Sequence, residues 1–133
     1  AHSLYSGEQP ALAAHLINRH SKLFGVHLND GYSKRDDGLM VGAVHLQSTL
    51  ELLREIGRDG YDGVLYFDTF PDQSGLDPVA ECAHNIATVQ RLLGVAQRLD
   101  GDNRLATAQA NQDAVASQRV VATALLGPSP VDQ

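Results

Sequence analysis

Apolar residues recur at helical spacing in three stretches of the chain, each bounded by residues typical of helix ends. Pro10 suits the first turn of a helix that runs to about His20, and Asp77-Pro78 suits the start of one that runs to about Leu99. A further stretch lies between them and ends in Arg58-Asp59-Gly60. The stripes are Leu12, Ala13, Leu16 and Ile17; Leu46, Leu50, Leu53 and Ile56; and Val79, Cys82, Ala83, Ile86, Val89 and Leu93. This spacing predicts three helices with one buried face each.

Two short apolar runs lie between these helices and have the character of strands. Phe24–Asn29 alternates, and its side chains divide into Phe24, Val26 and Leu28 on one face and Gly25, His27 and Asn29 on the other. Val64–Asp68 is apolar up to its last residue, which predicts a strand buried on both faces. Two strands joined by a helix form a parallel βαβ unit. Because parallel sheets are larger than two strands, the pattern indicates part of a larger α/β domain.

The two ends of the chain differ from this pattern. Residues 1–9 are expected to form a loop. Beyond the break Asp100-Gly101-Asp102, the segment Asn103–Leu126 is rich in Ala and Gln and predicts one helix with a weak stripe. That helix either packs across a neighbouring subunit of a homo-oligomer or docks on its own domain, and the pattern favours neither. We expect residues 1–99 to belong to the α/β domain and residues 100–133 to form a helical tail with a disordered end.

The composition excludes several classes of protein. Hydrophobic residues make up 43% of the 133, which is too many for a disordered chain. The net charge of −6 argues against a nucleic-acid surface, and no apolar run reaches the roughly 18 residues of a membrane span. The chain opens without the features of a signal peptide, and its single cysteine cannot form an internal disulfide. These observations predict a cytoplasmic protein without a nucleic-acid or membrane partner.

The strand ends and the loop between them carry the candidate chemistry. His27 lies near the end of the first run, Asp36 lies in the polar loop that follows it, and Asp68 closes the second run. Imidazole and carboxylate groups at strand ends and in strand-to-helix loops are the usual ligands of a metal in an α/β barrel. Each residue also has a simpler interpretation: a hydrogen-bonded histidine, a solvated turn and a turn-capping aspartate. The remaining histidines on helices and their flanks are interpreted as surface or packing residues: His15, His20, His45 and His84.

Four stretches, in order, resemble the C-terminal part of the xylose isomerase-like barrel family, and within it the metal-dependent L-rhamnose isomerase type. They are Ala1-His2-Ser3-Leu4-Tyr5-Ser6-Gly7-Glu8, His27-Leu28-Asn29-Asp30-Gly31-Tyr32, Asp36-Asp37-Gly38-Leu39-Met40-Val41-Gly42 and Tyr66-Phe67-Asp68-Thr69-Phe70-Pro71. The resemblance covers roughly residues 1–95 and leaves out the tail. It implies the C-terminal portion of a (β/α)8 TIM barrel, with about two parallel strands and three helices, followed by the helical tail.

The resemblance also implies a metal site and an activity. In that family, two divalent cations bind a small sugar at the mouth of the barrel and polarise its carbonyl during hydrogen transfer between C1 and C2. His27 and Asp68 match ligands of the structural, substrate-binding metal, whereas His2 and Asp36 match ligands of the second, catalytic metal. Mn²⁺ is the expected ion, and Mg²⁺, Co²⁺ or Zn²⁺ suit the same ligands. Neither a catalytic base nor a sugar-binding residue can be named from the sequence.

One departure from the family pattern bears on this expectation. The family has acidic residues at alternate positions of the loop, where this chain has Asp36 and Gly38. Either Asp37 substitutes by a shift of register, or the second metal is weakly bound or lost. The remaining ligands would lie on N-terminal barrel strands that these residues do not include, so we expect the isolated chain to be inactive.

Two other functions compete with a sugar isomerase or epimerase. A degenerate barrel segment that serves as an interaction or structural module fits Gly38. An endonuclease IV-type nuclease shares the barrel and a His-x-Asn-Asp segment, but that family has a ligating Asp-x-His where this chain reads Asp36-Asp37-Gly38. The acidic charge also disfavours the nuclease. The sequence does not specify which sugar would be bound.

Overall fold

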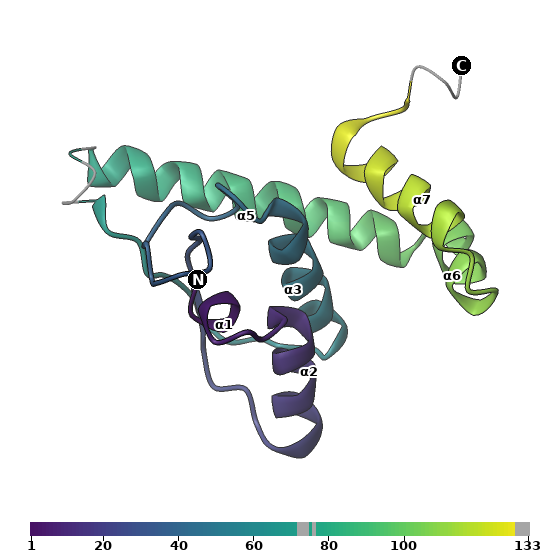
Figure 1. The fold of residues 1–133 in the computed structure, drawn as a ribbon, viewed down its shortest axis with the longest axis horizontal. Coiled ribbons are helices and arrows are strands. Elements are labelled where there is room, and N and C mark those ends of the chain that lie inside the picture. The colour runs from purple at the N-terminus through teal and green to yellow at the C-terminus, as the bar shows by residue number, and fades with distance from the viewer. Residues whose placement is uncertain (72–74, 76, 130–133) are drawn as a thin grey trace. The chain divides into compact units, whose positions relative to one another are not determined.

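The computed structural model describes residues 1–71, 75 and 77–129 (Figure 1). The chain divides into two compact units, Ala1–Leu93 and Gly94–Gln133. The first unit contains α1 (His2–Tyr5), α2 (Pro10–His20), β1 (Val26–Leu28), α3 (Leu46–Arg58) and β2 (Leu65–Phe67). The helix α5 (Pro78–Asp100) begins in the first unit and ends in the second, which also contains α6 (Asn103–Ala110) and α7 (Ala114–Leu126).

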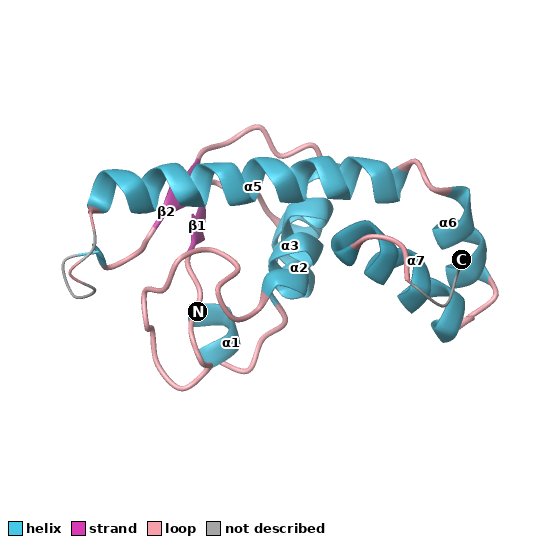
Figure 2. Cartoon of the chain, turned by 90° about the horizontal axis from the view of Figure 1, so that it is seen from above, coloured by secondary structure: helices cyan, strands magenta, loops and turns pink. Residues whose placement is uncertain are grey.

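The two strands are parallel neighbours joined through α3, as the sequence predicts for a βαβ unit (Figure 2). In register, Val26 pairs with Leu65, His27 with Tyr66 and Leu28 with Phe67. The α/β class with two parallel strands is therefore confirmed. Both strands are shorter than predicted, and Asp68 follows β2 rather than lying in it.

The sheet has one buried face and one exposed face. Val26 and Leu28 are buried, whereas His27 and Tyr66 point to the opposite, exposed face with their rings 4.8 Å apart. The alternation predicted for these residues of β1 is confirmed, but Phe24 lies outside the strand and is 84% exposed. The prediction that the second strand is buried on both faces is wrong, because no described element covers the face that carries Tyr66.

Helices α2 and α3 pack side by side (Figure 1). The stripe predicted for α3 is confirmed at Leu50, Leu53 and Ile56, which are all buried, but not at Leu46, which is 38% exposed at the start of the helix. The stripe predicted for α2 is wrong, because its large apolar residues point outward: Leu12, Leu16 and Ile17. The small Ala14 is buried instead. A small residue lets the two helices approach closely, and a polar contact between His15 and Glu55 lies beside it.

The face that α5 buries also differs from the prediction. Asp77 caps the helix as expected, with Oδ1 accepting from the N–H of Val79 at 2.9 Å. However, Val79, Cys82 and Ile86 are exposed, whereas Asn85 and Val89 are buried. The Oδ1 of Asn85 accepts a hydrogen bond from the N–H of Val41 at 2.9 Å. The helix therefore turns a polar side chain inward, because the loop it packs on presents backbone groups that need partners.

The second unit contains two helices where the sequence predicts one. Helix α6 ends at Ala110, Gln112 has a φ of +54°, and Asp113 caps α7 by accepting from the N–H of Ala116 at 2.9 Å. Asp102 caps α6, and the hydrogen bonds from Arg104 lower the pKa of its carboxyl to about 2. The predicted disordered end lies outside the described residues. Across residues 1–71 and 77–129, no helix is both long and apolar enough to cross a membrane.

We predict that Leu53→Ala lowers the free energy of unfolding by about 2–5 kcal/mol, because the fully buried side chain leaves a cavity between packed helices. Leu12→Ala is the matched control on α2, where the side chain is 56% exposed, and it should change stability by roughly 0.5 kcal/mol or less. Urea unfolding followed by circular dichroism checks both values. Equal effects would show that the outward orientation of Leu12 is wrong.

Candidate metal site at the ends of the strands

His27 and Asp68 come together at the carboxyl end of the sheet. The N–H of Asp68 donates to the carbonyl of Leu28 at 3.0 Å, which continues the pairing of the strands by one residue. The side chains then face each other with His27 Nδ1 3.7 Å from Asp68 Oδ2. That distance is too long for a hydrogen bond. It is close to the roughly 3.3–3.6 Å between two ligands of a four-coordinate cation.

His2 and Asp36 form a second pair. The segment expected to be a loop contains the short helix α1, which carries His2 at its first residue. The Nδ1 of His2 lies 3.3 Å from Oδ2 of Asp36, which belongs to the polar loop after β1. The structure therefore pairs the four predicted ligands in the same combinations that the family resemblance assigns to its two metals.

Asn29 connects the two pairs. Its Nδ2 donates to Oδ1 of Asp36 at 2.7 Å and to the backbone carbonyl of Asp68 at 2.9 Å. Its Oδ1 accepts from the nitrogen of Ala1 at 3.0 Å. Asn29 thus holds α1, the loop and the end of β2 in one arrangement. Asn29 is not among the residues predicted from the sequence, and the signal that could identify it is an amide at the strand end, two residues after His27.

A pocket of about 240 Å³ lies beside these residues. Its lining includes the polar residues His2, His27, Asn29 and Asp68, together with apolar residues such as Leu52 from α3. The pocket is smaller than the roughly 300–1,000 Å³ typical of sites for drug-sized ligands, and its walls combine polar and apolar side chains. It has room for a small molecule whose polar groups face His27 and Asp68.

Each pair supplies fewer ligands than a metal needs. Within the described part of the chain, the four residues make two separate pairs, and the one group of three ligands in mutual reach is His15, Glu55 and Asp59. Bound cations take about four ligands for Zn²⁺ and six or more for larger hard cations. A metal at either pair would require further ligands. The role of the four residues as ligands stays a prediction.

Asp30, the neighbour of Asn29, has a structural role. It is 2% exposed, and its carboxylate accepts from the N–H groups of Gly31, Val44 and His45 at 2.7–2.8 Å. The Nδ1 of His45 lies 2.8 Å from Oδ1 of Asp30. Burial raises the pKa of Asp30, but the hydrogen bonds from His45, Val44 and Gly31 outweigh it and lower the pKa below 3.8. His45 is accordingly a packing residue, as the sequence indicates.

The loop leaves no room for a side chain at position 38. Gly38 has a φ of +60°, and a Cβ built there would clash with the ring of Phe70. An acidic side chain at this position would have to displace Phe70. Asp37 does not take its place, because its carboxylate accepts from the N–H of Tyr32 and the Nε of Arg35, both at 2.8 Å. The hydrogen bonds from Tyr32 and then Arg35 lower the pKa of Asp37, so the loop itself uses this carboxylate.

We predict that Asp30→Asn destabilises the protein by about 1–3 kcal/mol at pH 7, because three buried N–H groups lose a charged acceptor. The pKa of Asp30 is lowered on folding, so its contribution is fully present above 3.8 and is lost as the pH falls through the folded value. Urea unfolding at pH 7 and at pH 3 should therefore show a smaller pH dependence in the variant. Asp62→Asn, on an exposed residue, is the control.

We predict that Gly38→Ala is more destabilising than Gly60→Ala. Both glycines have a positive φ, so both variants incur backbone strain of order 1–3 kcal/mol. Only Gly38 also places the new Cβ against Phe70, whereas nothing lies within 4 Å at Gly60. Thermal unfolding of the two variants separates strain from the clash. Equal melting temperatures would show that Phe70 moves away freely.

No protein-family model matches this chain, and no curated protein is significantly similar to it.

Proposed function

We propose that this chain forms part of the active site of a divalent-metal-dependent sugar isomerase, an enzyme that interconverts an aldose and a ketose. The observation that carries the proposal is the pairing of His27 with Asp68 and of His2 with Asp36 at the same end of two parallel strands. In α/β barrels, catalytic groups gather at the carboxyl ends of the strands. The four residues meet that requirement although they come from four separate segments.

The residues of the chain have distinct roles in this proposal. His27 and Asp68 would hold the substrate-binding metal, and His2 and Asp36 would hold the second. When bound, the metals act as Lewis acids toward the sugar oxygens and carbonyl. Asn29 positions both pairs through its three hydrogen bonds. The adjoining pocket would receive the sugar.

The surface of the first unit is consistent with a larger barrel. The sheet face that carries His27 and Tyr66 is exposed, and β1 and β2 pair only with each other among the described strands. The outward stripe of α2, with Leu12 and Leu16, is also exposed. In the proposal, further strands extend this sheet on both sides, further helices cover the stripe, and the additional strands supply the missing metal ligands.

A second candidate function is a degenerate barrel segment that acts as a structural or interaction module. Gly38 and Asp37 favour it, because the first lacks a ligand atom and the second is used within the loop. If the chain is such a module, the second metal site is the weaker of the two, because neither Gly38 nor Asp37 adds a ligand to His2 and Asp36.

We predict that the 133-residue chain binds Mn²⁺ weakly and that His27→Ala and Asp68→Asn each reduce the affinity by roughly tenfold or more, as expected for the loss of a ligand. Electron paramagnetic resonance of free Mn²⁺ during a titration measures this directly. His84→Ala is the matched control, since it removes an exposed histidine from α5. Asp36→Asn should weaken only the second, looser binding event.

The outcomes separate the two candidates. Binding that is sensitive to His27 and Asp68 supports the metal site, and Mn²⁺-dependent conversion by a longer polypeptide that contains this sequence would then establish the isomerase. The 133-residue chain by itself should convert no aldose. Absence of stoichiometric binding of Mn²⁺ or Co²⁺ by the longer polypeptide would favour the non-catalytic module.

A further inference from the structure

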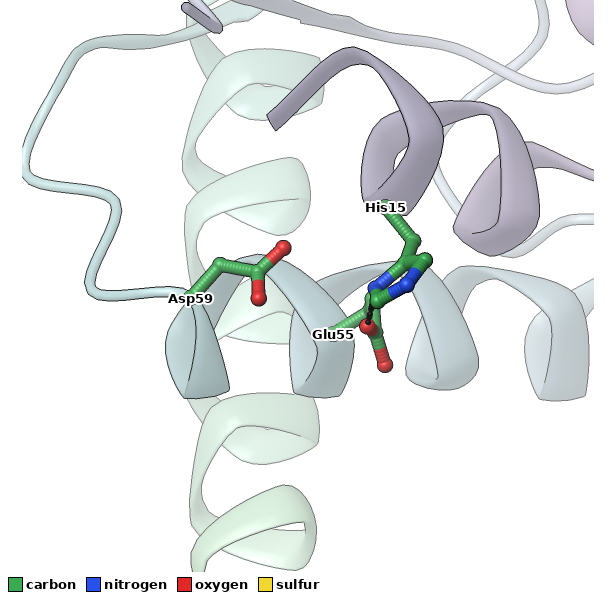
Figure 3. A group of neighbouring side chains, drawn as sticks. All are labelled: His15, Glu55 and Asp59. Atoms are coloured by element: carbon green, nitrogen blue, oxygen red, sulfur yellow. Dashed lines mark hydrogen bonds and ion pairs between the residues drawn. The ribbon is translucent and has the colours of Figure 1, made fainter. Parts of the chain in front are cut away.

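A second group of metal-type ligands lies between α2 and α3, away from the strand ends. His15 comes from the middle of α2, Glu55 comes from the last turn of α3, and Asp59 caps the C-terminal end of that helix (Figure 3). One ligand atom from each of the three lies within 4.8 Å of the others. The Nδ1 of His15 is 2.7 Å from Oε1 of Glu55. None of the three is buried, so water and ions can reach the group.

The packing of the two helices creates this group. Glu55 and Asp59 are four residues apart, so they lie on the same face of α3. The buried Ala14 brings α2 close to α3, and the next residue, His15, is directed at the carboxylates. The N–H of Asp59 donates to the carbonyl of Glu55 at 3.0 Å, which attaches Asp59 to the last turn of the helix. The hydrogen-bonded backbone of α2 and of the end of α3 therefore fixes the positions from which the three side chains extend.

Carboxylates follow one another closely along this face of α3, and His15 is directed at Glu55 rather than at Asp59. Glu51, Glu55 and Asp59 follow one another at intervals of four residues on α3, and like charges at this spacing repel. Asp59 also sits at the C-terminal end of the helix, where the helix dipole disfavours an anion. Glu51 receives neutral amide donors from Gln9 and Gln47. The structure shows no hydrogen bond to the side chain of Asp59 from any described residue, and a cation would relieve this repulsion.

We propose that His15, Glu55 and Asp59 bind one transition-metal dication, with Zn²⁺ and Co²⁺ as the best-suited ions. One imidazole nitrogen and two carboxylate oxygens form a ligand set that these ions accept, with water at the remaining positions. Ligands of a tetrahedral ion lie about 3.3–3.6 Å apart. The ligand atoms of His15 and Glu55 must therefore move apart by less than about 1 Å, and that of Asp59 must move closer by up to about 1.5 Å. We expect rotation of the side chains to supply both movements.

Such an ion would tie α2 to α3. Because α2 buries only Ala14 among its residues, its apolar contact with the rest of the unit is small. A ligand that binds only the folded state raises stability in proportion to the logarithm of its concentration over its Kd. The site is thus expected to act as a structural clamp that is independent of the strand-end pairs.

Zn²⁺ binding to the full chain tests the proposal. Isothermal titration calorimetry should detect one Zn²⁺ whose affinity falls on the order of 100-fold in Asp59→Asn and in His15→Gln. Asp59→Asn is the more informative variant, since the side chain of Asp59 makes no hydrogen bond with a described residue and its removal should leave the fold intact. Asp62→Asn, in the loop that follows α3, removes the same charge and should leave the affinity unchanged.

The double variant His2→Ala/His27→Ala separates this site from the proposed sugar site. Zn²⁺ binding that survives the double variant and is lost in Asp59→Asn supports the clamp, whatever the fate of the isomerase proposal. Co²⁺ should then broaden the amide resonances of α2 around His15 in a two-dimensional spectrum. The proposal is overturned if Asp59→Asn binds Zn²⁺ as the unchanged chain does, or if no Zn²⁺ is bound at millimolar concentration.

Discussion

The buried carboxylate of Asp30 is the interaction on which the first unit depends. It accepts hydrogen bonds from Gly31, Val44 and His45, and in this way it joins the end of β1 to the start of α3. The backbone of Asp30 also pairs with Leu39 in both directions at 2.9 Å, which closes the polar loop at its base. A buried carboxylate is tolerated only when its oxygens are satisfied, and these donors satisfy them.

This constraint explains how a short sheet can position a site. Because Asp30 points into the interior, its neighbour Asn29 points the other way and reaches Asp36 and the backbone of Asp68. The loop is tied a second time where the N–H of Phe70 donates to the carbonyl of Gly38 at 3.0 Å. The relative places of His2, His27, Asp36 and Asp68 therefore follow from a network of hydrogen bonds rather than from apolar packing.

The two candidate metal sites arise from different kinds of contact. At the strand ends, the candidate ligands form two pairs that come from β1, α1, the polar loop and the residue after β2, and each pair leaves coordination positions open for other ligands or substrate. Between α2 and α3, three ligands come from two packed helices. Open positions suit chemistry on a substrate, whereas ligands from two helices suit a structural role.

The sequence by itself determined the features that depend on neighbouring residues in the chain. The bounds of α2 and α3, the cap at Asp77, the break before α6 and the parallel pair of strands all follow from local propensity, periodicity and turn residues. The buried faces of α3 and β1 also follow from the spacing of their apolar residues, but only the tertiary structure decided which faces of α2 and α5 are buried. Leu12 is exposed because α2 turns the small Ala14 toward α3 and its larger apolar residues away from it. Asn85 is buried because its Oδ1 accepts a hydrogen bond from the N–H of Val41 in the loop on which α5 packs. The meeting of His15 with Glu55 was likewise beyond the sequence, since their 40-residue separation is bridged only by the packing of two helices.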